Sequence, residues 1–122
     1  MNSTLVRMNA SNTYTLGNTT FELTLGLSPE KTPVLQTLTL SSQPGINWAC
    51  PTRPLAPLLR IQEVTYSPAT GNMPFQRFEA DTQGLELRLQ FRLPNGLEVT
   101  QHLKPSFDKA AWRSWVTTAR AC

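Results

Sequence analysis

The sequence predicts an all-β fold, a two-layer antiparallel β-sandwich with at most one short helix. Several short segments alternate apolar and polar residues, which is the period of a strand with one buried face. Ten prolines in 122 residues oppose long helices. A chain of this length buries about two-thirds of the surface that its unfolded form exposes. We therefore expect residues 1–122 to form one β-sandwich domain, either whole or part of a larger one.

The clearest element is a hairpin within residues 84–104, where apolar and polar residues alternate on both sides of Pro94-Asn95-Gly96. A two-residue loop would mix the apolar and polar faces of the two strands. A three-residue loop keeps the faces apart and gives Gly96 the left-handed conformation that glycine favours. That register pairs Leu93 with Leu97, Phe91 with Val99, Leu87 with Leu103, Arg92 with Glu98, and Glu86 with Lys104. We expect the apolar face to pack on a second sheet and the charged face to meet water.

The remaining elements are shorter. Residues 1–12 form either a loosely held arm or a first edge strand, and residues 18–20 a turn. Alternation or threonine-rich composition predicts strands at residues 21–27, at residues 34–40, and around Phe75 and Phe78. Loops are expected at residues 67–74 and 81–84.

Two segments leave the type of element open. Residues 41–57 are irregular because prolines stand at positions 44, 51, 54 and 57. Leu55–Val64 fits either a short helix that begins at these prolines or a strand over residues 59–66, and the strand is preferred. After Pro105, Asp108 is expected to cap one helical turn that reaches Trp112, and residues 115–119 return to strand.

Composition excludes several kinds of partner. The net charge is +3, and the basic C-terminal end is expected to be solvated surface, so no nucleic acid partner is predicted. Cys50 and Cys122 either pair or stay free, and with one histidine they predict no zinc site and no cofactor. We expect no membrane span. No signal peptide is visible, which favours a soluble cytoplasmic protein.

The sequence shows no catalytic constellation. His102, the only histidine, lies beside Arg88 in the expected register and is interpreted as an ordinary exposed residue. Glu86 and Glu98 each oppose a cation and are interpreted as ion-pair partners rather than as a glycosidase pair. No catalytic residue is predicted, and the chain alone is not expected to be an enzyme.

Aromatic residues are the remaining candidates for binding. Flat indole and phenol rings can stack on sugars, which makes Trp48, Trp112, Trp115 and Tyr66 candidate ligand-binding residues. The alternative is that they are core or interface residues, as tryptophans in small sandwiches often are. Trp112 and Trp115 lie three positions apart, so an extended backbone points them to opposite faces and a helical turn brings them together.

Two motifs in the C-terminal third resemble a known family. Gly96-Leu97-Glu98-Val99-Thr100-Gln101-His102-Leu103 and Trp112-Arg113-Ser114-Trp115-Val116-Thr117 resemble the N-terminal β-domain of melibiase-type α-galactosidases, the family 36 glycoside hydrolases. In that family a strand of the form Gly-Leu-Glu-Val-Thr-x-His leads into an aromatic-rich strand that ends in Arg-Asn. Here Ala121 and Cys122 follow Arg120 in place of the asparagine. The resemblance covers about 25 of 122 residues.

The resemblance implies a β-supersandwich that packs on a catalytic (β/α)-barrel, where the family's catalytic aspartates lie. No catalytic residue carries over to this chain. The expected function is therefore that of a non-catalytic accessory domain of an α-galactosidase-like glycoside hydrolase. One alternative is a stand-alone carbohydrate-binding module that uses exposed tryptophans. The other is a β-domain for protein–protein interaction, for example one that forms a homo-oligomer.

Overall fold

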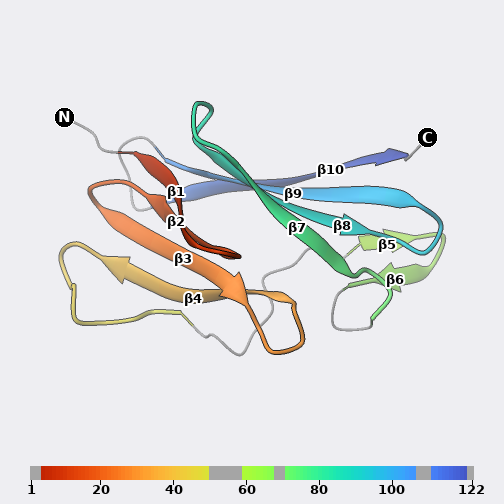
Figure 1. Cartoon of the computed structure of the whole chain (residues 1–122), viewed down its shortest axis with the longest axis horizontal. Helices are drawn as coiled ribbons and strands as arrows, with labels where there is room; N and C mark the ends of the chain where they lie inside the picture. Colours follow the sequence, from red (N-terminus) through yellow and green to blue (C-terminus); the bar gives the residue numbers. More distant parts are fainter. Residues whose placement is uncertain (1–3, 50–58, 68–70, 107–110, 121–122) are drawn as a thin grey trace.

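The computed structural model describes residues 4–49, 59–67, 71–106 and 111–120. These residues form ten strands and no helix, and the two larger sheets are antiparallel and packed on each other (Figure 1). The predicted all-β sandwich is confirmed.

Each large sheet consists of strands that follow one another in the sequence. The N-terminal sheet has the order β1–β2–β3–β4, with bounds Leu5–Ala10, Thr13–Gly17, Phe21–Leu27 and Pro33–Leu40. The C-terminal sheet has the order β10–β9–β8–β7, with β7 at Phe75–Asp81, β8 at Glu86–Arg92, β9 at Leu97–Pro105 and β10 at Trp112–Arg120. A small hairpin, β5 (Leu59–Ile61) and β6 (Val64–Tyr66), forms a separate two-stranded sheet.

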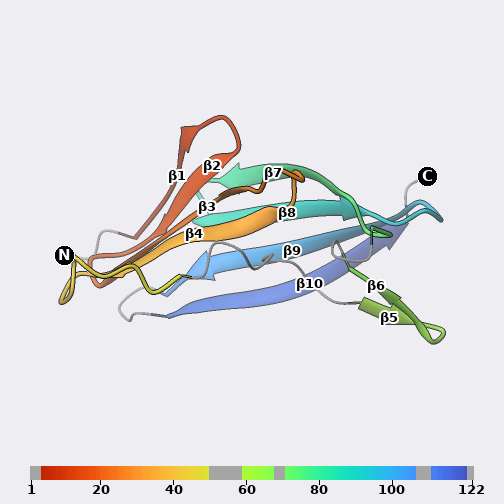
Figure 2. The ribbon, with the colours of Figure 1, turned by 90° about the horizontal axis from the view of Figure 1, so that it is seen from below.

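The core lies between the two large sheets. Period-two alternation directs one row of each strand inward, and the contacts between the sheets concentrate where β1 meets β7 and β2 meets β9. Figure 2 shows the strands of each sheet side by side, with β4 and β10 at the margins of their sheets. The core residues with the least exposure include Leu16, Phe21, Leu23, Leu25, Met73, Leu87, Leu89, Phe91, Val99 and Leu103.

The predicted hairpin register is confirmed. Phe91 pairs with Val99, Leu87 with Leu103, and Arg92 with Glu98. The Leu93 amide donates to the Leu97 carbonyl at 2.9 Å, which closes the three-residue loop, and Gly96 has a φ of 87°. The apolar face of this hairpin is buried, as expected.

The strands predicted at residues 21–27, at residues 34–40 and around Phe75 and Phe78 correspond to β3, β4 and β7. Of the two alternatives for the N-terminus, residues 5–10 form an edge strand. Residues 13–17, outside every predicted strand, form β2, which joins β1 to β3.

Two predictions need correction. The expected helical turn through Trp112 is wrong at that residue, since Trp112 begins β10 and pairs with Pro105; Asp108 lies outside the described residues. The strand preferred over residues 59–66 is a hairpin of two three-residue strands, because Gln62 and Glu63 turn the chain with φ values of 50° and 66°. Residues 55–58, Cys50 and Cys122 also lie outside the described residues.

A hydrogen bond between residues far apart in the sequence links the two sheets. The Asn18 side chain, between β2 and β3, donates from Nδ2 to the Ser106 carbonyl at 2.7 Å. Its Oδ1 accepts the Thr20 amide at 2.7 Å and so also shapes the turn into β3. The predicted turn at residues 18–20 therefore connects the N-terminal sheet to the end of β9.

Candidate functional site

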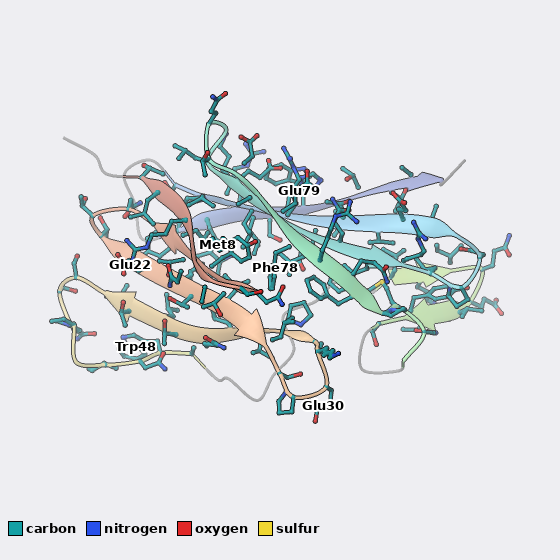
Figure 3. The ribbon with its side chains drawn as sticks, viewed as in Figure 1. Met8, Glu22, Glu30, Trp48, Phe78 and Glu79 are labelled. Carbon is teal, nitrogen blue, oxygen red and sulfur yellow. The ribbon has the colours of Figure 1, made fainter. Side chains whose placement is uncertain are left out.

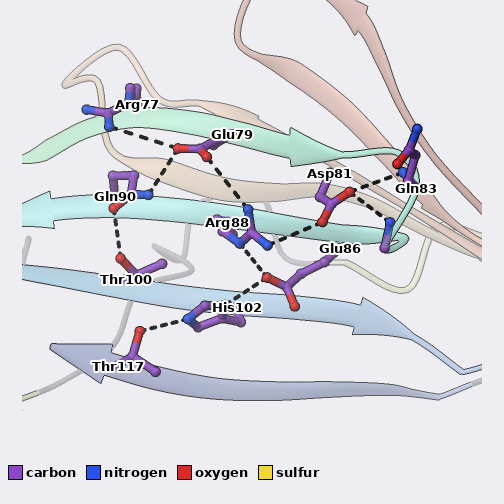
Figure 4. A network of polar contacts seen from close by, with 11 residues as sticks. Arg77, Glu79, Asp81, Gln83, Glu86, Arg88, Gln90, Thr100, His102 and Thr117 are labelled. Atoms are coloured by element: carbon purple, nitrogen blue, oxygen red, sulfur yellow. Dashed lines mark hydrogen bonds and ion pairs between the residues drawn. The ribbon is translucent and has the colours of Figure 1, made fainter.

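The outer face of the C-terminal sheet carries a connected set of polar side chains (Figure 4). The alternation that buries the leucines of β8 and β9 directs the intervening polar residues away from the core. We call the connected residues the outer-face cluster: Arg77, Glu79, Asp81, Glu86, Arg88, Gln90, Thr100, His102 and Thr117. It extends across all four strands of this sheet.

Glu86 is the least exposed carboxylate in the ion pairs of this cluster, with 13% of its side chain exposed. Its Oε2 accepts hydrogen bonds from Arg88 Nε and, at 2.8 Å, from His102 Nδ1. Burial acts to raise the pKa of Glu86, but the hydrogen bonds from His102 and Arg88 and the charge of Arg88 outweigh it and lower the pKa. Glu86 is therefore held as a carboxylate.

The contact between Glu86 and Arg88 also shifts the pKa of Arg88. The hydrogen bond to Glu86 is the main reason that the pKa of Arg88 lies above its ordinary value, and the charges of Asp81 and Glu79 act in the same direction. At Asp81, the backbone amide of Gly84 is the main cause of a lowered pKa. Arg88 thus lies among three carboxylates and is fixed in place on β8.

His102 is more enclosed than the sequence predicts. Its side chain is 14% exposed, so the interpretation as an exposed residue is wrong, although Arg88 does stand opposite it on β8. Its ring stacks on Trp115 of β10, with centroids 4.9 Å apart and planes 1° apart. Its Nε2 contacts Thr117 Oγ1 at 2.8 Å. The position of β10 beside β9 accounts for this burial.

Thr117, His102 and Glu86 follow one another in the order of a hydroxyl, a base and an orienting carboxylate. Nucleophilic catalysis also needs a place for the substrate beside the hydroxyl. The three cavities lined by Asn18 and Phe21, by Thr4 and Lys104, and by Glu30 and Gly71 do not include His102 or Thr117. Glu86 is shared with Arg88 rather than reserved for His102. The three residues form a polar bridge across β8, β9 and β10.

The two ion pairs predicted for the hairpin have different outcomes. Arg92 Nη2 contacts Glu98 Oε1 at 2.9 Å, which confirms the first pair. The second pair, Glu86 with Lys104, is replaced by contacts of Glu86 with Arg88 and His102. Lys104 instead stands opposite Arg113 in the register of β9 and β10. The two cations line a cavity of about 330 Å³ together with Thr4 and Leu85.

The four aromatic candidates are not brought together. Trp48 follows β4 and is 54% exposed (Figure 3), and Tyr66 is a partly buried residue that packs against the core. Trp112 is 38% exposed, and its ring lies 6.0 Å from that of Phe21 on β3. Trp115 carries His102 on its ring and has the Arg113 guanidinium 5.5 Å from its centroid.

Trp112 and Trp115 point to opposite faces of β10, as expected for an extended backbone. Trp112 pairs with the buried Pro105, while Trp115 pairs with His102 of the outer-face cluster. The ring of Trp115, on the outer face, is thus in contact with His102 and Arg113 of the same sheet. Among the four candidates, Trp48 and Trp112 present the most exposed rings.

Within the described part of the chain, no group of three or more His, Cys, Asp or Glu side chains is placed to hold a metal ion. The described residues also include no helix long and apolar enough to cross a bilayer.

Comparison of the chain with known proteins finds no matching family model, no similar curated protein and no similar solved structure.

Proposed function

We propose that the chain is a non-catalytic accessory β-sandwich that acts by packing on another domain. The observation that supports this most directly is the distribution of exposed apolar side chains. Trp48, Ile46, Trp112 and Val116 are between 38% and 54% exposed and lie on β10 and on the segment after β4. Exposed aromatic and aliphatic residues of this kind are typical of contact surfaces.

The resemblance in the C-terminal third supports the kind of partner. Leu97–Leu103 and Trp112–Thr117, which carry the resemblance to family 36 glycoside hydrolases, lie in the adjacent strands β9 and β10. The proposed partner is a (β/α)-barrel of the α-galactosidase type, which supplies the catalytic carboxylates. The role of this chain is to shape or support the barrel's substrate cleft.

The test begins with a search of the reading frame after the codon for Cys122, and of the adjacent genes, for a barrel of this type; a search that finds none counts against the proposal. Co-expressed with this chain, the barrel is expected to co-purify with it and to hydrolyse p-nitrophenyl α-galactoside, whereas the chain alone hydrolyses none. Trp48→Ala and Trp112→Ala are expected to weaken the association. Met8→Ala is the matched control, because Met8 is 62% exposed on β1, another edge of the sandwich. Hydrolysis by the chain alone, or a barrel that neither binds it nor responds to it, would overturn the proposal.

A second candidate function is carbohydrate binding, favoured by the exposed ring of Trp48. Indole faces stack on sugar rings, and exposure leaves this face available. Titration of the wild-type chain with galactosides, followed by tryptophan fluorescence, is expected to give a saturable change. Calorimetric titration, which needs no indole as reporter, is expected to show binding that Trp48→Phe retains in part and Trp48→Ala loses. An unchanged spectrum at saturating sugar would exclude this function.

A further inference from the structure

Three of the four edge strands in the sandwich have irregular pairing. The pairing of β1 shifts register between Met8 and Ala10, and that of β7 shifts between Phe75 and Arg77. The pairing of β4 with β3 shifts where Thr24 and Leu25 face Thr37 and Leu35. Bulges of this kind twist an edge away from an incoming strand, and natural sheets use them to prevent association. β1 and β7 are therefore poor templates for a further strand.

The edge of β4 is covered by the segment that follows it. The Trp48 amide donates to the Leu38 carbonyl at 2.9 Å. The Asn47 side chain accepts the Leu38 amide at 3.0 Å and donates to the Gln36 carbonyl at 3.1 Å. These three bonds satisfy the backbone groups that an added strand would otherwise use.

Within the described part of the chain, the remaining edge, β10, has neither protection. It pairs with β9 residue by residue from Trp112 to Arg120 without a register shift. Among the described residues, no backbone hydrogen bond reaches its other edge. The strand contains no proline. A long, regular edge with free amide and carbonyl groups is a template for strand addition.

The side chains on the inner side of β10 are also incompletely covered. Trp112 and Val116 are 38% and 39% exposed on the side that continues the core face of β9. Gln101, which pairs with Val116, is only 8% exposed, yet its Oε1 has no hydrogen-bond partner among the described residues. A buried acceptor without a donor is costly, so this margin of the core is incomplete as it stands.

We propose that the free edge of β10 accepts an added β-strand from another polypeptide, an acidic extended segment with alternating apolar residues. Its apolar side chains would cover Trp112 and Val116, and its carboxylates would face the outer side, where Arg113 lies. Charge favours such a segment over a second copy, since β10 carries Arg113 and Arg120 and no carboxylate. The inference rests on the proposed function, because it states how the partner domain attaches.

The experiment uses the intact chain and a synthetic probe, the nine-residue peptide Glu-Val-Thr-Val-Glu-Val-Thr-Val-Glu with blocked ends. Binding is measured by fluorescence anisotropy of the labelled peptide. Amide hydrogen exchange within Trp112–Arg120 locates the contact: amides that face away from β9 exchange rapidly in the free chain and slowly with the peptide bound. A peptide with its two central valines replaced by proline lacks two donors and is expected not to bind.

Two lysine variants separate strand addition from charge attraction. Val116→Lys places a charge on the inner side and is expected to weaken peptide binding at least about tenfold, because the added strand would bury it. Ala119→Lys adds the same charge to the exposed outer side of β10 and is expected to keep or increase the affinity. Neither side chain is buried in the free chain, so both variants are expected to fold.

The outcomes are distinct. Loss of binding in Val116→Lys alone, with slowed exchange along β10, supports the proposal. Equal binding to both variants, or equal binding of the proline peptide, overturns it. Slow exchange at both edges of β10 without peptide also overturns it, and sedimentation then shows whether a second copy holds the edge. If the chain binds the peptide but does not bind the barrel, the proposed function is rejected and the strand-addition site is kept.

Discussion

The two faces of the β8–β9 hairpin are formed by alternate residues of the same two strands, but they are held by different forces. On the inner face Leu87, Leu89 and Phe91 are at most 1% exposed. On the outer face polar side chains meet in pairs, and their burial varies along the strands. Glu86, which contacts His102 of β9, is 13% exposed, whereas Arg92 and Glu98 are 52% and 42% exposed near the turn. The comparison teaches that the inner face provides the stability, and that the outer face contributes in proportion to how far its ions are removed from water.

The largest effect is expected on the inner face. Phe91→Ala removes a ring that packs edge-to-face on Phe75, with centroids 5.5 Å apart, and should lower the free energy of unfolding by about 3–5 kcal/mol. Urea denaturation measures this loss. Val116→Ala, at a side chain 39% exposed, is the control, with an expected change of about 0.5 kcal/mol or less. A similar loss in both variants would remove the contrast between covered and uncovered residues.

The enclosed end of the outer face should give an intermediate effect. Glu86→Gln keeps the shape of the side chain but removes the charge that Arg88 and His102 contact. Hydrogen bonds to charged groups contribute about 1.5–3 kcal/mol, so near neutral pH we expect a loss at the lower end of that range. Glu98→Gln, at the exposed end, is the matched control and should lose less.

The same variant should change the dependence of stability on pH. The pKa of Glu86 is lower in the folded protein than its ordinary value of 4.5. Its contribution is therefore complete above that ordinary value and is lost as the pH falls through the lowered folded pKa. Denaturation curves at decreasing pH should show a shallower acid decline in Glu86→Gln, with the remaining slope due partly to Asp81, whose pKa is also lowered. An unchanged decline would mean that Glu86 is not held as a carboxylate.

The smallest effect is expected at the exposed end. A double-mutant cycle with Arg92→Gln and Glu98→Gln should give a coupling energy of about 0.2–1 kcal/mol that decreases with added salt. The pair is 2.9 Å apart but solvated on both sides. A coupling energy equal to that between Glu86 and Arg88 would show that burial does not set the strength of these pairs.

The fold was predictable where two signals agreed. In the β8–β9 hairpin, alternation on both strands and the chemistry of the turn at Gly96 select one register. The β5–β6 hairpin has three-residue strands, which are too short to show a period. β10 lacks clear alternation, and the structure gives the reason: its inner side is partly uncovered, so Ser114 and Thr118 are tolerated there beside Val116.

The candidate site was predictable only within the hairpin. The register places His102 opposite Arg88, as expected. Thr117 and Trp115 come from β10, and no turn signal between β9 and β10 fixes how the two strands align. The contacts that enclose His102 therefore depend on a strand pairing that the sequence leaves undetermined. The contact of Glu86 with His102 lies within the predicted hairpin but is diagonal, so the pairing of directly opposed residues did not identify it.

The order of strands in the two sheets has a kinetic consequence. Every neighbour in the N-terminal sheet and every neighbour in the C-terminal sheet is also the next strand along the chain. Each pairing closes only a short loop, so little chain entropy is lost before the next hydrogen bonds form. Because the contact order within each sheet is low, the strands of each sheet should pair rapidly. The hydrogen bond between Asn18 and Ser106, which are far apart in the sequence, would form when the two sheets associate.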